Sequence, residues 1–188
     1  MIQHPAIVDL VNAIKNAVSD TRDPATIFKL VAPKVKSLAK DQSWLKREYF
    51  ECDDEQGMGI TVLNKEHDNS IFVETVAWLP GRGVFPHDHK TWGIVIGIDG
   101  TEVNVNWERI DDGKDKKFAD IKISGERKIG NGDVVFFLPD DIHSVLNQGK
   151  KNSLSLHMYG KALASLKRFE FDPVNKIRRL CPQRIRRE

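Results

Sequence analysis

The stretch that decides the fold is residues 81–100, which read GRGVFPHDHKTWGIVIGIDG. His87 and His89 stand two positions apart in it, with Asp88 between them. Side chains at positions i and i+2 of a β-strand point to the same side of the sheet, so both imidazoles are expected to aim at one point and Asp88 to face away. Neutral imidazole is a common protein ligand for Zn, Cu, Ni and Fe. Taken alone, such a pair also fits two surface histidines near a turn, so further residues have to decide.

A second stretch, residues 132–148, reads GDVVFFLPDDIHSVLNQ and carries a third histidine, His143. It opens on a Gly-Asp pair, and Pro139 precedes a turn. Both stretches are rich in Val, Ile and Phe and are interrupted by Gly, Asp and Pro, which is the composition of short strands joined by turns. Three histidines in two strand-rich stretches are therefore candidates for one metal site.

From about residue 57 onward, the sequence has the period of two that is typical of β-strands. Asp99-Gly100 between two apolar runs is a strong hairpin signal. Many short strands at regular spacing are typical of a closed barrel or a jelly roll. The predicted strands are 58–64, 71–79, 91–98, 101–109, 118–123, 134–138, 144–148 and 152–160.

The N-terminal section has the spacing of amphipathic helices instead. In residues 4–20 and 24–39, apolar side chains recur at helical intervals. Asp23-Pro24 supplies a capping residue followed by proline at the first helical position. A short third helix is compatible with residues 43–49.

A length of 188 residues fits one domain. We expect a helical section, residues 1–50, that packs on a barrel, residues 51–188, which ends in a basic tail. The net charge of +2 and the 30% of charged residues are those of an ordinary globular protein. The tail is expected to be a solvated segment, and nucleic acid is not an expected partner. Its basic residues are Lys176, Arg178, Arg179, Arg184, Arg186 and Arg187.

The sequence indicates a cytoplasmic protein. Its first residues lack the charged-then-apolar layout of a signal peptide, and no run of about 18 apolar residues could span a membrane. The two cysteines, Cys52 and Cys181, are far apart and do not form a disulfide framework. We therefore expect a reducing compartment and no membrane partner, and the oligomeric state stays open.

The spacing of the two histidine stretches resembles that of the two cupin motifs. In the first, the pair His87 and His89 is followed by Gly93 and Gly100 at the expected intervals, and in the second His143 takes the ligand position. The resemblance implies a mainly β cupin barrel, that is, a double-stranded β-helix or jelly roll, with N-terminal α-helices. It also implies a metal ion on the three histidines. The second motif departs from the pattern, because its turn is one residue shorter and lacks the usual glycine.

A further departure concerns the charge of the metal site. Most cupins place a glutamate ligand three or four residues after the histidine pair, and here that position is Gly93. A divalent ion on three neutral imidazoles would keep its full charge and favour an anionic ligand such as a thiolate. Asp140 or Asp141 is an alternative source of a carboxylate, although a role in the turn is expected for both.

Residues 152–160, NSLSLHMYG, alternate between polar and apolar side chains. Ser153, Ser155, His157 and Tyr159 fall on one face, which is expected to point into the cavity of a barrel whose outer layer is apolar. Buried polar groups have to bond to each other or to a ligand. The set is therefore either a structural hydrogen-bond network or part of a ligand site.

Gly93 together with the pattern Ser155-x-His157-x-Tyr159 resembles the thiol dioxygenases of the cysteine dioxygenase type. The resemblance covers about residues 70–172. It implies an Fe(II) cofactor, with a small thiol and O2 as partners in the reaction and a sulfinate as the product. It also implies that Tyr159 hydrogen-bonds to ligands of the iron, and that the histidine and the serine orient the phenol.

Arg168 indicates which branch of that family is the more similar. No arginine lies between Arg47 and Arg82, where the cysteine-oxidising branch has the arginine that binds the substrate carboxylate. Arg168 follows Tyr159 by nine residues, an arrangement similar to the 3-mercaptopropionate dioxygenase branch, and a guanidinium suits bidentate carboxylate binding. The alternative for Arg168 is a surface arginine on a late strand. The Cys–Tyr thioether of the mammalian-type enzyme is not expected, since Gly93 stands at the cysteine position.

Two other functions stay open at this point. Another metal-dependent cupin enzyme, such as a different oxygenase or an isomerase, would share the metal site without the preference for a thiol. A non-enzymatic sensor or binding module would use the basic tail to contact a polyanion. The residues do not decide between 3-mercaptopropionate and cysteine, and three imidazoles would also accept Zn, Ni or Cu.

Overall fold

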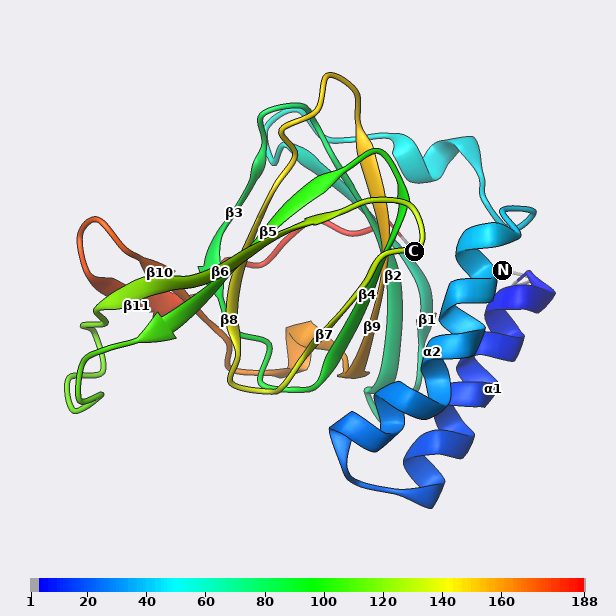
Figure 1. Cartoon of the computed structure of the whole chain (residues 1–188), viewed down its shortest axis with the longest axis horizontal. Coiled ribbons are helices and arrows are strands. Elements are labelled where there is room, and N and C mark those ends of the chain that lie inside the picture. Colours follow the sequence, from blue (N-terminus) through cyan, green and yellow to red (C-terminus); the bar gives the residue numbers. More distant parts are fainter. Residues whose placement is uncertain (1–3, 188) are drawn as a thin grey trace.

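The structure is a computed structural model that describes residues 4–187 and combines two α-helices with two β-sheets (Figure 1). The helices are α1 (Pro5–Asp20) and α2 (Pro24–Lys40), and two short 3-10 turns are η1 (Arg47–Phe50) and η2 (Leu163–Ser165). The strands are β1 (Met58–Lys65), β2 (Ser70–Trp78), β3 (Gly83–His87), β4 (Gly93–Asp99), β5 (Glu102–Arg109), β6 (Ile121–Ile129), β7 (Val134–Phe137), β8 (Ile142–Leu146), β9 (Ser153–Lys161), β10 (Phe169–Asp172) and β11 (Ile177–Leu180).

The two predicted helices are confirmed, and each begins at a capping residue. His4 caps α1 and Asp23 caps α2, each by accepting a hydrogen bond from a backbone N–H of the first turn, which would otherwise lack a partner. The helix predicted at 43–49 is wrong in extent, because only Arg47–Phe50 are helical and they form a single 3-10 turn. Neither helix within residues 4–187 is long and apolar enough to cross a membrane.

The strands form two antiparallel sheets that enclose one interior (Figure 1). The five-stranded sheet has the order β1-β2-β9-β4-β7, and the six-stranded sheet has the order β11-β10-β3-β8-β5-β6. Several neighbouring strands, such as β2 and β9 or β3 and β8, are far apart in sequence, because the polypeptide passes repeatedly from one sheet to the other, as it does in a jelly roll. The mainly β jelly-roll barrel with N-terminal helices is thereby confirmed.

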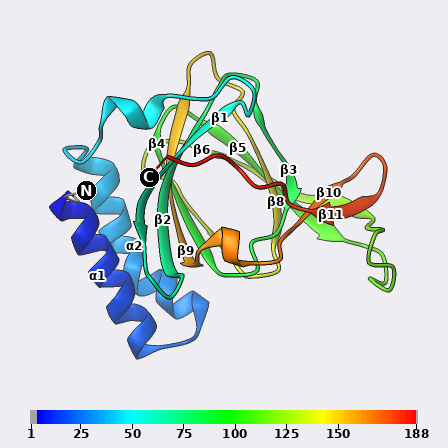
Figure 2. The ribbon, with the colours of Figure 1, turned by 180° about the vertical axis from the view of Figure 1, so that it is seen from behind.

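Helices α1 and α2 cover the outer face of the five-stranded sheet, as both views of the ribbon show (Figures 1 and 2). Leu154, Leu156 and Met158 of β9 are fully buried in the same apolar cluster as Leu10 and Ile14 of α1. Burying a side chain of this size stabilises the fold by roughly 1.5–3 kcal/mol. The apolar face of β9 is thus used against the helices, and its polar face is turned to the barrel interior, as the alternation predicts.

The strand predictions fail where a strand is short or largely exposed. Strands β3, β10 and β11 are not predicted, because their four or five residues neither establish a period of two nor form an apolar run such as the one that marks β7. Strand β6 spans Ile121–Ile129 instead of 118–123, since most of its side chains are exposed and carry no apolar pattern. Strand β8 begins at Ile142, two residues before the predicted start.

The C-terminal tail is bound to the barrel, which corrects the prediction of a solvated segment. The Arg187 N–H donates to the carbonyl of Ile60 at 2.9 Å, and the Arg187 carbonyl accepts from the Val62 N–H at 2.8 Å. The tail, red in Figure 2, therefore runs from β11 across the barrel to the edge strand β1. Backbone pairing with a sheet edge does not depend on side-chain charge, so the basic composition of the tail could not predict it.

Candidate metal centre

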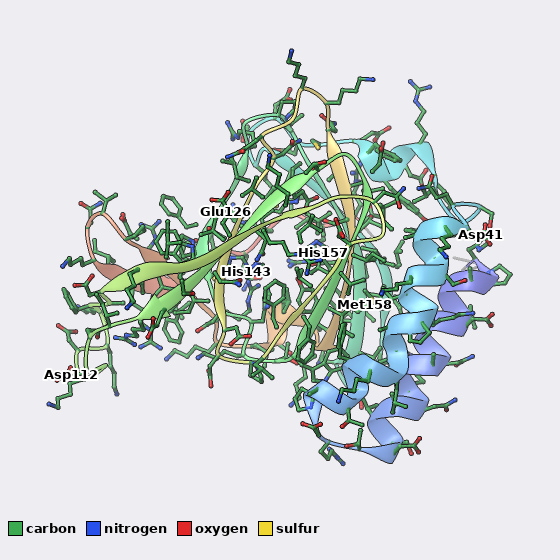
Figure 3. The ribbon with its side chains drawn as sticks, in the orientation of Figure 1. Asp41, Asp112, Glu126, His143, His157 and Met158 are labelled. Atoms are coloured by element: carbon green, nitrogen blue, oxygen red, sulfur yellow. The ribbon has the colours of Figure 1, made fainter. Side chains whose placement is uncertain are left out.

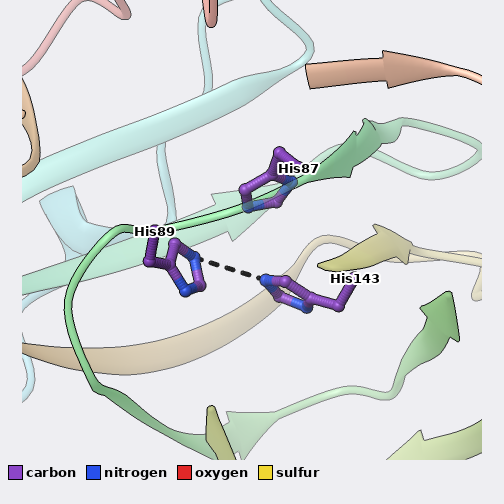
Figure 4. Close-up of side chains that lie close together, drawn as sticks. All are labelled: His87, His89 and His143. Carbon is purple, nitrogen blue, oxygen red and sulfur yellow. Dashed lines mark hydrogen bonds between the residues drawn. The ribbon is translucent and has the colours of Figure 1, made fainter. Parts of the chain in front are cut away.

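Three histidines, two from neighbouring strands and one from the segment after β3, meet inside the barrel (Figure 4), and we refer to His87, His89 and His143 as the histidine cluster. His87 ends β3 and lies opposite His143 of β8 in the antiparallel register. His89 follows two residues later, in the segment that leads into β4. The expectation that both members of the pair lie on a strand is wrong for His89, because the polypeptide leaves the β3–β8 pairing after His87 to cross to the other sheet.

The distances in the histidine cluster fit the ligands of a single ion. One nitrogen atom from each ring lies within 4.8 Å of those of the other two rings, and His89 Nε2 is 3.3 Å from His143 Nε2. Two nitrogen ligands at about 2.0–2.1 Å from a metal are roughly 2.9–3.4 Å apart when they subtend about 90–109° at the ion. The separation of these two nitrogen atoms therefore matches adjacent ligands of one metal.

Two rings of the cluster are held by acceptors that do not titrate. His87 Nδ1 donates to the carbonyl of Phe85 at 3.0 Å, and His143 Nδ1 donates to Asn104 Oδ1 at 2.6 Å. An acceptor at Nδ1 places the ring hydrogen there and leaves Nε2 with a free lone pair. For His143 this is the nitrogen that faces His89, whose own Nδ1 is buried without a hydrogen-bond partner.

Burial keeps all three rings neutral. It lowers the pKa of His87 to about 3, with a smaller contribution from the charge of Arg168. The pKa values of His89 and His143 also lie well below 6.5, first because of burial and then because of neighbouring histidines. Neutral imidazole is the form that binds a metal. Near pH 7 the cluster can therefore take up a cation without first releasing protons.

No carboxylate belongs to the histidine cluster in the described part of the sequence. Asp140 is exposed, and Asp141 bonds within its own turn. At Gly93 an added Cβ atom would lie 3.1 Å from the ring of Tyr159, and this ring packs against His89 with centroids 4.9 Å apart. A glutamate at position 93 and the tyrosine would thus compete for the same space.

The polar face of β9 forms a continuous hydrogen-bond relay of three buried side chains. The Tyr159 hydroxyl lies 2.9 Å from His157 Nδ1, and His157 Nε2 lies 2.9 Å from Ser155 Oγ. Figure 3 places His157 and His143 in the barrel interior and Met158 on the side of the helices. The serine, histidine and tyrosine singled out in the sequence thus bond to one another, next to the histidine cluster.

One small cavity joins the histidine cluster to the relay and to Arg168. Its volume is about 70 Å³, and the cluster, His157, Tyr159 and Arg168 all line it. Arg168 Nε donates to the backbone carbonyl of Asp88 at 3.1 Å. Among residues 4–187, the two Nη atoms of this arginine have no hydrogen-bond partner. The half-buried arginine therefore presents a free end of its guanidinium group at the cavity.

Sequence reasoning misses several charged groups around this cavity. Arg184 and Arg186 of the tail line it, and Arg186 forms a 2.9 Å ion pair with the buried carboxylate of Glu74. Glu102 does not line the cavity but accepts hydrogen bonds from two serines of β9. A glutamate within an apolar strand, such as Glu74 in SIFVETVAW, is a signal that could have been used. The tail arginines carry no such signal, because their contacts span more than a hundred positions.

Comparisons with known proteins do not assign the chain to a family. No protein-family model matches the sequence. An oxalate oxidase in complex with the substrate analogue glycolate is 15% identical over 62% of this chain, with a TM-score of 0.47, and the match spans only 59% of that chain. KdgF from Halomonas sp. is 15% identical over 61% of this chain and 88% of its own, with a TM-score of 0.45. A cupin superfamily protein from Desulfitobacterium hafniense is 13% identical over 60% of this chain and 84% of its own, with a TM-score of 0.43. At these identities the similarity says nothing about ligand or activity.

Proposed function

We propose that the protein is a thiol dioxygenase that holds Fe(II) through His87, His89 and His143. The reaction adds both atoms of O2 to the sulfur of a small thiol that bears a carboxylate, R–SH + O2 → R–SO2H. The substrate would be 3-mercaptopropionate and/or cysteine. The observation that carries the proposal is the meeting of an all-imidazole cluster, a buried phenol and a free guanidinium in one cavity.

The donor set of the histidine cluster suits a divalent metal that keeps its positive charge. Because the three ligands are neutral, an M²⁺ ion brings its full charge into a cavity that already contains the cation of Arg168. Such a cavity favours anionic ligands, and a thiolate is one. When bound, Fe(II) would supply the redox chemistry, while the protein supplies orientation and charge. Imidazole also binds Zn, Ni and Cu, so Fe(II) is proposed because the reaction needs a redox-active metal.

Arg168 is the residue proposed to bind the carboxylate of the substrate. Its Nε is engaged by the backbone of Asp88, which fixes the side chain and leaves the two Nη atoms for a bidentate contact. The carboxylate and the sulfur would then lie at opposite ends of the ligand. The cavity is small, about 70 Å³, which favours a small ligand.

Tyr159 is proposed to donate a hydrogen bond to the sulfur or oxygen ligand. Burial raises the pKa of this phenol above its usual 10, so the hydroxyl keeps its hydrogen near pH 7. His157 and Ser155 would hold the phenol in place through the relay. A preorganised donor in a buried cavity is worth much more to an anion than the same donor in water.

The direct test is O2 consumption by the Fe(II)-loaded protein with cysteine, cysteamine and 3-mercaptopropionate. We expect O2 uptake and sulfinate formation with a carboxylate thiol, and little turnover with cysteamine, which has no carboxylate. Absence of O2 uptake with all three would contradict the proposal. Turnover of a substrate without a thiol would support a different cupin enzyme, and salt-dependent retention on nucleic acid without turnover would support a binding module.

Replacing Arg168 tests the carboxylate site. In Arg168→Gln we expect the KM for 3-mercaptopropionate to rise about 10–100-fold, since a hydrogen bond to a charged group contributes roughly 1.5–3 kcal/mol. Kinetics with cysteamine should not change. Lys167→Gln alters the exposed neighbouring cation and should behave as wild type. An unchanged KM in Arg168→Gln would remove this arginine from the substrate site.

A further inference from the structure

The hydrogen-bond relay of β9 continues to a carboxyl group on the opposite sheet. Glu102, the first residue of β5, lies 3.1 Å from Ser155 Oγ through Oε2 and 3.1 Å from Ser153 Oγ through Oε1. Its side chain is buried, and it forms no ion pair within residues 4–187. Four buried groups therefore bond in series across the barrel interior, in the order Tyr159, His157, Ser155 and Glu102.

Three of these four groups carry a constant number of hydrogens near pH 7. Burial lowers the pKa of His157 to about 3, so the ring is neutral and has one N–H. Burial raises the pKa of Tyr159, so the phenol keeps its O–H. The hydroxyl of Ser155 has one hydrogen as well. Each of these three groups can thus donate only one hydrogen bond along the relay. Glu102, at the end of the relay, decides in which direction the hydrogen bonds are donated.

An ionised Glu102 draws every donor toward itself. A carboxylate can only accept, so Ser155 donates its single hydrogen to Glu102 at 3.1 Å in preference to the carbonyl of Val76 at 3.5 Å. The serine oxygen then accepts from the Nε2–H of His157, and the bare Nδ1 accepts from the hydroxyl of Tyr159. In this state the phenol hydrogen is used within the relay, and the phenol oxygen can only accept from a ligand in the cavity.

A protonated Glu102 that carries its hydrogen on Oε2 allows every bond of the relay to reverse. Its carboxyl hydrogen is donated to Ser155, and the serine donates to Nε2 of His157. The ring hydrogen then lies on Nδ1 and is donated to the oxygen of Tyr159. The hydroxyl of Tyr159 is free to donate to a ligand. The two states differ by a single proton, on a group separated from the tyrosine by two residues of the relay.

We propose that Glu102 is a positioning residue that decides, by holding or releasing one proton, whether Tyr159 presents a donor or an acceptor to the cavity. This inference deepens the proposed function, and the catalytic role of Glu102 rests on that proposed function. An anionic ligand such as a thiolate is stabilised by the donor and repelled by the acceptor. Anion binding and proton uptake by Glu102 are therefore linked, and the donating state is lost as the pH rises.

The environment of Glu102 supports a change of state near neutral pH. Burial raises the pKa of this carboxyl to about 7, against smaller downward effects of the hydrogen bonds from Ser155 and Ser153. A solvated glutamate would be ionised throughout the neutral range and could not reverse the relay there.

The elements packed around Glu102 bring no unpaired charge to it. Strand β6 places Ile129 opposite it, and the next inward residue of β5 is an amide, Asn104. Strand β9 contributes the two serines and a neutral imidazole. On β2 the carboxylate of Glu74 is paired with Arg186. Titration of this carboxyl is therefore governed by its own burial and by the relay.

Nitrogen NMR of the His157 ring tests the direction of the relay without any thiol or O2. The sample is the full-length protein with ¹⁵N-labelled histidine, with and without diamagnetic Zn(II), and His157→Gln assigns the signals. In the wild type we expect the ring hydrogen on Nδ1 at about pH 5.5 and on Nε2 at about pH 8.5, with a midpoint near 7. In Glu102→Gln the ring should keep one tautomer throughout. Glu170→Gln, which alters a buried glutamate paired with Arg179 outside the relay, should switch as the wild type does.

A wild-type tautomer that is the same at both pH values would overturn the proposal, and this measurement needs no variant. A switch that persists in Glu102→Gln would also overturn it. Since the readout does not involve thiol oxidation, a protein that proves inactive toward thiols can still pass or fail it. Where the protein is active, kcat/KM should fall above about pH 7 in the wild type, and this fall should be missing in Glu102→Gln.

Discussion

The histidine cluster and the relay from Tyr159 to Glu102 are both buried networks, but their last acceptors differ. Two rings of the cluster are anchored by the carbonyl of Phe85 and the amide of Asn104, which accept at every pH. The relay ends on a carboxyl that can hold or release a proton. The hydrogen bonds of a network keep one donor-to-acceptor direction when the last acceptor cannot take up a proton. They can reverse when the last acceptor titrates. Metal-binding imidazoles need a hydrogen-bond direction that does not change with pH. A group such as Tyr159, which meets different ligands in the cavity, can use a direction that does change.

The largest expected effect comes from breaking the histidine cluster. His143→Ala removes one of three ligands, and we expect metal affinity to fall by more than about 100-fold. Loss of a residue that only hydrogen-bonds to a metal ligand lowers the affinity about 10–100-fold, and loss of the ligand itself should cost more. Thiol-dependent O2 uptake should disappear with the metal. Metal content after gel filtration measures the effect, with His67→Ala in an exposed turn as the control. Full metal content in His143→Ala would contradict the assignment of the cluster.

The next effect concerns the end of the relay that faces the cavity. Tyr159→Phe keeps the ring beside His89 and removes only the hydroxyl. We expect kcat to fall about 10²–10³-fold, the usual result of deleting one preorganised donor, with unchanged metal content. Tyr49→Phe alters a buried tyrosine of the apolar cluster and should leave kcat unchanged. A wild-type kcat in Tyr159→Phe would separate the relay from catalysis.

The titratable end of the relay should be visible in stability as well. The pKa of Glu102 is about 7 in the folded protein, against an ordinary value of 4.5. Between these values the folded state holds a proton that the unfolded state has released, so the free energy of unfolding falls as the pH rises through this window. The gap corresponds to about 3 kcal/mol. Urea unfolding of the metal-free protein should show this loss in the wild type relative to Glu102→Gln, and parallel pH profiles would contradict it.

The smallest effect is expected from removing Asn104, the amide that anchors His143 and does not titrate. Asn104→Ala leaves His143 in place but removes the acceptor of its Nδ1–H. We expect metal affinity to drop about 10–100-fold, measured by competition with a chelator. Asn175→Ala, in an exposed turn, is the matched control. An affinity equal to that of the wild type would mean that packing alone orients the ring of His143.

Much of the candidate site could be predicted because its members are close together in sequence. His87 and His89 are two positions apart, and Ser155, His157 and Tyr159 alternate along one strand. For such groups, strand periodicity alone places the side chains on one face. The barrel could be predicted for a similar reason, since the period of two repeats over most of the sequence after residue 57.

The partners that lie across the barrel could not be predicted in this way. Glu102 meets Ser155 only because β5 and β9 belong to opposite sheets that face each other. Arg186 reaches Glu74 only because the tail pairs with β1. Such contacts depend on register and closure, which no local pattern encodes.

The sequence by itself determined the mainly β architecture with its helical cover, the three imidazoles, and the alternation that turns a serine, a histidine and a tyrosine inward. The physical reason is that apolar and polar periodicity acts over a few neighbouring residues. Only the tertiary structure decided what each of these groups bonds to: an amide behind His143, a carboxyl at the end of the relay, and a tail of arginines at the cavity. Those bonds join residues dozens of positions apart, and their existence depends on how the two sheets close on each other.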